Sequence, residues 1–96
     1  MKYRHSILVD NFDKCYICHR PAEAVHHCVY GAGRRNISER EGFLMPLCNY
    51  HHNMSLFSVH LDPEMDKGVK ALCQKKYEET HTREDWIRLV GRNYLD

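Results

Sequence analysis

The chain has 96 residues, of which 43% are hydrophobic and 28% are charged, the composition of one small folded domain. Lys and Arg number 14 and Asp and Glu 13, so the formal charge of +1 gives no strong basic field to attract nucleic acid. No apolar run approaches the ~18 residues of a membrane span or resembles a signal peptide. These features favour a cytoplasmic protein with no membrane partner, and the odd count of 5 Cys argues against a closed disulfide framework.

The first part of the chain predicts short strands separated by turns. The apolar run 7–9 predicts a short strand or an extended arm, and 15–20 contains a Cys-x-x-Cys turn. Residues that favour β-structure predict strands over 24–30 and 43–47. The polar segment 34–42 between them has no hydrophobic period, so we expect a surface loop there.

Two helices are predicted in the last part of the chain. Asp62 and Pro63 provide an N-cap side chain followed by Pro at the first helical position, and they predict a helix over about 62–79. Thr82 opens a pattern similar to a capping box, which predicts a second helix over about 82–91. This order of elements indicates a small α+β fold.

Four residues have the spacing of a zinc knuckle. Cys15 and Cys18 form one pair, and Cys48 and His51 form another. A gap of two residues lets both members of a pair reach one ion from a tight turn, and two pairs complete a tetrahedral Zn²⁺ site. Because protein ligands fill all four positions, we expect this zinc to be structural.

Further histidines lie on both sides of the knuckle. His51 and His52 are adjacent on an expected helix, so their side chains diverge by about 100° and His52 must face away from the zinc. It would face the strand that carries His26 and His27, and His60 could fold back toward the same point. A lone histidine in a strand is more often structural, but four around a knuckle indicate a divalent metal with open coordination positions. Because adjacent strand residues point to opposite faces, His26 and His27 can share a site only if the strand ends, bulges or twists there.

This arrangement resembles the HNH, or His-Me finger (ββα-metal), nucleases, in the subgroup that a zinc knuckle braces. More narrowly, residues from about 6 to 95 resemble small phage-type proteins similar to the recombination-enhancement, RecA-dependent nuclease family. The matching segments are Glu23–His27, Gly33–Arg35, Ser38–Arg40, Gly42, Leu47-Cys48, His51-His52, Val59-His60 and Gly91–Leu95. The resemblance implies one domain over 1–96, with a zinc-braced ββα-metal (treble-clef-like) core at about 15–60 and two additional C-terminal helices.

The same resemblance implies a metal-dependent endonuclease that nicks DNA and leaves a 5′ phosphate and a 3′ hydroxyl. His27 would be the general base, and His26, His52 and His60 would hold a catalytic Mg²⁺, Mn²⁺ or other divalent ion. A neutral imidazole can take a proton from water at pH 7, and a divalent ion can stabilise the charge that builds on the leaving 3′ oxygen. A phage-derived protein of this kind would act in the host cell cytosol, with a recombinase filament as a further partner.

Two positions depart from the family pattern. The family usually has an Asn nine residues before the helix histidine, where its carbonyl orients the general base, and Phe43 occupies that position here. Either a backbone carbonyl orients His27 or this subgroup does without the Asn. The helix position that often supplies a further ligand is Leu56, so His60 would have to supply that ligand from beyond the helix.

Arg34, Arg35 and Arg40 lie in the expected loop, which the resemblance places beside the catalytic histidine, so the three are candidates for phosphate contacts. A solvated charged loop is the equally weighted alternative. Five further cations are expected on helix surfaces: Lys75, Lys76, Arg83, Arg88 and Arg92.

A second function is a non-catalytic zinc-binding module that binds nucleic acid or a recombination protein. Phe43 at the Asn position and the small net charge both favour it. This module predicts one metal per chain, whereas a nuclease predicts a second and weaker site.

Overall fold

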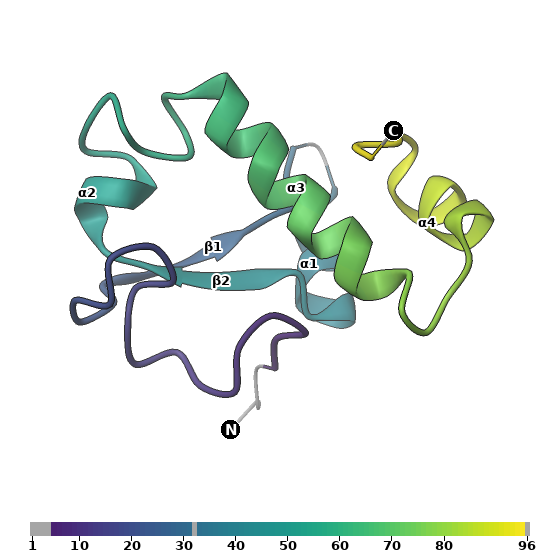
Figure 1. The fold of residues 1–96 in the computed structure, drawn as a ribbon, viewed down its shortest axis with the longest axis horizontal. Coiled ribbons are helices and arrows are strands. Elements are labelled where there is room, and N and C mark those ends of the chain that lie inside the picture. The colour runs from purple at the N-terminus through teal and green to yellow at the C-terminus, as the bar shows by residue number, and fades with distance from the viewer. Residues whose placement is uncertain (1–4, 32, 96) are drawn as a thin grey trace.

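The computed structural model describes residues 5–31 and 33–95, in which it shows two strands and four helices (Figure 1). The elements are β1 (Ala24–His27), α1 (Arg35–Glu41), β2 (Leu44–Leu47), α2 (Asn49–His52), α3 (Pro63–Tyr77) and α4 (Arg83–Val90). A two-stranded sheet with helices around it confirms the α+β class expected from the sequence. No helix in these two ranges is both long enough and apolar enough to cross a membrane.

The two strands form an antiparallel hairpin that places His26 within β1 and Cys48 directly after β2. β1 pairs with β2 along its whole length, with His27 opposite Leu44. Every residue of β2 is buried, and the Pro46 carbonyl accepts a hydrogen bond from the Tyr16 amide at 2.8 Å. This bond attaches the Cys-x-x-Cys turn to the hairpin.

The apolar run at 7–9 forms an arm without regular strand pairing. The Ile7 amide donates to the Gly42 carbonyl at 2.9 Å, and the Ser6 hydroxyl donates to the Leu44 carbonyl at 2.6 Å. Ile7 and Leu8 pack against the hydrophobic core. The arm therefore covers the start of β2, in agreement with the second of the two expectations for this run.

The expectation of a surface loop over 34–42 is wrong, because α1 occupies most of this segment. Its polar sequence has no stripe of apolar side chains, but Ile37 packs against the core and Ser38 is fully buried. The Ser38 hydroxyl donates to the Val29 carbonyl at 2.7 Å and accepts from the Val29 amide at 2.9 Å. The Ser38 hydroxyl thus occupies the Val29 amide and carbonyl, which would pair with a neighbouring strand if β1 were longer. β1 ends at His27 instead of at the predicted residue 30. Gly42 ends the helix in the left-handed region, with φ of 80°.

The helices α3 and α4 lie within their predicted ranges and bury the hairpin against an aromatic cluster. The Phe43 ring lies 5.8 Å from the Tyr77 ring and 5.3 Å from the Trp86 ring, measured between centroids. Asp62 accepts from two amides at the start of α3, and Thr82 forms a full capping box at the start of α4. Both N-terminal signals in the sequence therefore mark real helix starts.

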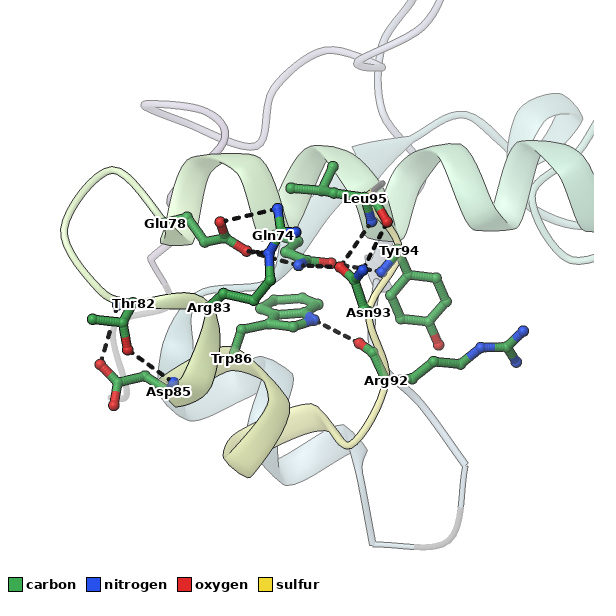
Figure 2. A network of polar contacts seen from close by, with 10 residues as sticks. All are labelled: Gln74, Glu78, Thr82, Arg83, Asp85, Trp86, Arg92, Asn93, Tyr94 and Leu95. Carbon is green, nitrogen blue, oxygen red and sulfur yellow. Dashed lines mark hydrogen bonds and ion pairs between the residues drawn. The ribbon is translucent and has the colours of Figure 1, made fainter.

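The residues after α4 are attached to α3 by a polar network (Figure 2). Gln74 is fully buried, and its side chain donates to Asn93 at 2.8 Å and accepts from the Tyr94 amide at 2.7 Å. The indole of Trp86 donates to the Arg92 carbonyl at 2.7 Å. These three contacts fix the C-terminal segment against the rest of the domain.

Candidate metal centres and active site

The four knuckle residues converge on one point. The sulfur and nitrogen atoms that Cys15, Cys18, Cys48 and His51 could offer to an ion all lie within 4.8 Å of one another. The Cys48 sulfur lies 3.3 Å from His51 Nδ1, and the Cys18 and Cys48 sulfurs lie 3.7 Å apart. Three sulfurs and one imidazole in this arrangement could hold a metal ion with four protein ligands.

The environment of Cys15 favours the thiolate that a metal requires. Burial raises the pKa of this thiol, but hydrogen bonds from the backbone amides of Cys18, Cys48 and Ile17 and from the His51 side chain outweigh burial and lower the pKa to about 6. Amides that donate to a sulfur stabilise the negative charge that a metal-binding thiolate carries. The site is therefore chemically suited to a soft divalent cation.

Three histidines form a second group, called the histidine cluster below. One ring nitrogen from each of His26, His52 and His60 lies within 4.8 Å of the others. His52 Nε2 and His60 Nε2 are 3.2 Å apart, and the His26 ring centroid is 5.4 Å from that of His52 and 4.9 Å from that of His60. The structure thus brings together the three residues that the sequence resemblance assigns to a catalytic ion.

Local backbone geometry explains how the cluster forms. His26 lies in β1, and His52 is the last residue of α2, on a different side of that helix from His51. The chain then turns back, so that the Val59 amide donates to the His51 carbonyl at 2.8 Å and the His60 amide donates to the His52 carbonyl at 3.2 Å. This pair of bonds returns His60 to its position beside His52.

His26 provides a test of whether the cluster fits a metal. Its side chain is 1% exposed, and neither ring nitrogen has a hydrogen-bond partner within the described parts of the chain. Burial, followed by the nearby His60 and His52, lowers the pKa of His26 to about 3, so the ring is neutral at pH 7. A buried imidazole with no partner is unfavourable, and metal coordination by one nitrogen would remove part of that cost. Three imidazoles suit a divalent ion that keeps open positions.

A pocket of about 410 Å³ opens over the cluster. His27 is the last residue of β1, so its side chain reaches the same pocket as that of His26, which satisfies the condition set by strand geometry. The lining residues are Val25, His26, His27, Tyr30, Gly31, Arg35, His52, Asn53 and His60. The pocket therefore combines the metal-ligand candidates, the candidate base and one arginine.

Glu39 is a site residue that the sequence analysis did not identify. His27 Nε2 lies 2.7 Å from the Glu39 carboxylate, which is carried by α1, and the His27 side chain is 13% exposed. A hydrogen bond to a carboxylate requires a proton on Nε2, so Nδ1 of the neutral ring carries the lone pair. His27 Nδ1 has no partner among the residues described, which leaves it available to accept a proton.

Phe43, at the position of the family Asn, has a structural role. It is fully buried in the aromatic cluster and does not line the histidine pocket. Glu39 is the residue that contacts the candidate base instead. Prediction of a helix over 34–42 would have been needed to place Glu39 on the side of that helix that faces β1.

The three predicted phosphate-binding arginines lie in three different environments. Arg35 lines the histidine pocket, whereas Arg34 lines a neighbouring pocket and donates to the Val90 carbonyl. Arg40 is exposed and pairs with Glu41 at 3.2 Å. Of the three, Arg35 is the one that the structure places beside the histidines.

Comparison of the chain with models of protein families, with curated proteins and with solved structures found no significant match.

Proposed function

We propose that this chain is a metal-dependent endonuclease of the HNH, ββα-metal type that hydrolyses phosphodiester bonds in DNA. The observation that carries the proposal is the histidine pocket, in which His26, His52 and His60 converge beside a histidine whose Nε2 is held by a carboxylate. Three imidazole ligands next to an oriented base are the components of metal-assisted hydrolysis.

In this mechanism His27 acts as the general base. Glu39 takes the Nε2 side of the ring, which leaves Nδ1 to accept a proton from the water that attacks phosphorus. The imidazolium that forms is stabilised by the same carboxylate, as in other base–orienter pairs. Arg35, in the same pocket, would contact a non-bridging phosphate oxygen.

His26, His52 and His60 would hold the catalytic ion. A bound Mg²⁺, Mn²⁺ or other divalent cation supplies charge that stabilises the phosphate and the departing 3′ oxygen. The buried and unpartnered nitrogens of His26 support this assignment. In the same proposal, Zn²⁺ in the knuckle has a structural role, and its three thiol ligands suit a reducing compartment such as the cytosol.

The test is a plasmid-nicking assay with Mg²⁺ or Mn²⁺, carried out with and without a recombinase filament on the DNA. A general base contributes about 10²–10⁴ in rate, so His27→Ala should lower nicking by that factor. His81→Gln is the control, because His81 is exposed and stacks on Tyr77 outside the pocket. Nicking by His27→Ala at the wild-type rate, or inactive wild type under every condition, would reject the proposal.

One observation favours the second candidate, a zinc-binding module that binds a recombination protein or nucleic acid. The segment between His52 and His60 exposes large apolar side chains, which is typical of interaction surfaces. They are Met54 at 71%, Leu56 at 79% and Phe57 at 65% exposure. Metal analysis separates the two functions, because the module binds one ion per chain and the nuclease binds a second ion that His52→Ala removes.

A further inference from the structure

We propose that a second pocket, next to the histidine pocket, binds a phosphate group of the substrate that is not the group being cleaved. This pocket, called the arginine pocket below, has a volume of about 320 Å³ and is lined by Arg34, Lys70 and Arg92 with the rings of Tyr30 and Tyr94. Its volume is at the lower end of the range of about 300–1,000 Å³ for ligand sites. The assignment to a nucleic-acid phosphate rests on the proposed function, but the presence of a phosphate site does not.

The charges around the arginine pocket leave a positive excess. Lys70 pairs with Asp66 at 2.5 Å, and Tyr30 donates to the other oxygen of that carboxylate at 3.3 Å. Arg34 and Arg92 form no ion pair within the described parts of the chain. Two guanidinium groups therefore face the pocket without a compensating acid, which suits an anion with several oxygen acceptors.

Arg34 is fixed at this pocket by the end of α4. One of its N–H groups donates to the Val90 carbonyl, and its guanidinium lies against Gly91, where an added Cβ would be 3.6 Å from Nη2. A guanidinium has five N–H donors, so most remain for a ligand. The contact with Val90 orders the group before any ligand arrives, which lowers the entropic cost of binding.

The sequence predicts Arg92 on a helix surface, but the residue lies beyond the end of α4. The Trp86 indole donates to the Arg92 carbonyl, and the Gln74 side chain accepts from the Tyr94 amide, so hydrogen bonds to the backbone fix this segment. Figure 2 shows the Arg92 side chain and the Tyr94 ring extending to the same side of this segment, with the guanidinium carbon 5.6 Å from the ring centroid. Among the described residues, the Arg92 guanidinium contacts the Tyr94 ring but forms no ion pair.

Tyr30 connects the two pockets. It lines both of them, and its ring centroid lies 5.8 Å from that of His26 and 5.2 Å from that of His60. A chain of phosphates with one group in the histidine pocket could continue past this ring into the arginine pocket. This continuity favours a phosphodiester of nucleic acid over free phosphate as the source of the bound group.

The test measures binding in a His27→Ala background, so that cleavage does not interfere. Labelled duplex DNA is titrated at several salt concentrations, followed by fluorescence anisotropy, with Arg92→Gln as the pocket variant. Arg88→Gln is the matched control, because it removes the same charge from an α4 side chain that is 74% exposed. We expect Arg92→Gln to weaken binding about tenfold at low salt and to reduce the slope of log K against log salt by about 0.9, the value for one lost phosphate contact. Equal affinities and slopes for the two variants would overturn nucleic acid as the source.

Amide spectra in inorganic phosphate provide the second arm. In one outcome, inorganic phosphate shifts the amide signals of Gly91, Arg92 and Tyr94 in wild type but not in Arg92→Gln, while DNA shifts these signals in neither protein. That result would support the site and assign it to free phosphate. No difference between Arg92→Gln and Arg88→Gln with either ligand would overturn the site altogether. Wild type that binds DNA but does not nick it would reject the nuclease proposal, whereas weaker DNA binding by Arg92→Gln than by Arg88→Gln would still support the arginine pocket.

Discussion

Removal of metal from the knuckle should unfold the domain, not merely loosen it. Structural Zn²⁺ sites bind with about 10–16 kcal/mol near pH 7, whereas a domain of 96 residues has a total stability of about 5–14 kcal/mol. The binding free energy is therefore as large as the whole free energy of unfolding. Cys15 and Cys48 are 1% and 4% exposed and belong to the hydrophobic core, so the site cannot open without exposing that core.

The variant that tests this is His51→Ala, with His19→Asn as its control. His19 follows the Cys15–Cys18 turn, is exposed and has φ of 65°, a conformation that Asn tolerates better than Ala does. Zinc release by a chromogenic chelator and thermal unfolding by circular dichroism give the two readouts. We expect His51→Ala and chelated wild type to lose the cooperative transition, since each lost kcal/mol lowers the Tm of a domain of this size by about 4–8 °C. A cooperative transition within a few degrees of the wild-type Tm after complete zinc removal would refute the reasoning.

Two further substitutions test the active site and the core. Glu39→Ala should lower kcat for nicking about 10–100-fold with little change in KM or Tm, because the substitution frees the His27 ring without removing a metal ligand. The control is Glu41→Ala, on the same helix. Equal kcat values for the two variants would contradict a positioning role for Glu39. Phe43→Asn introduces the residue of the family pattern. It should lower the free energy of unfolding in urea by about 3–5 kcal/mol, because it leaves a cavity and an unpaired amide beside Trp86, and it should not raise the nicking rate. A variant that is stable and nicks faster would show that Phe43 has displaced a functional Asn.

The metal-site groupings could be predicted because they depend on short spacings. Two residues between Cys15 and Cys18 fix the geometry of a turn, and adjacent helix positions force His51 and His52 apart. The starts of α3 and α4 were equally local, since capping depends on three or four consecutive residues. Each of these local features is contained in one turn of chain, whereas the set of three histidine ligands was what the family resemblance implied.

The features that sequence did not predict depend on tertiary contacts. α1 is a helix of seven residues whose inward face is Ile37 and a buried Ser38, too short and too polar to show a hydrophobic period. A loop over 34–42 gives the Glu39 side chain no defined direction, so the sequence did not predict its contact with His27. Arg92 was misassigned for a similar reason: the contact between Trp86 and its carbonyl, which directs the chain after α4, is not encoded in local spacing.

The two candidate metal sites are connected through α2, which has only four residues. A helix this short has no stability of its own, because the cost of nucleating its first turn is not repaid by further hydrogen bonds. Its position must come from its ends: Cys48 precedes it as the N-cap and His51 lies within it, and both are zinc-ligand candidates. His52 follows directly, and its carbonyl receives the amide of His60. The knuckle thus sets the positions of two of the three histidines in the cluster. In the proposed function, a structural zinc with no open coordination position would therefore still determine whether the second site can form.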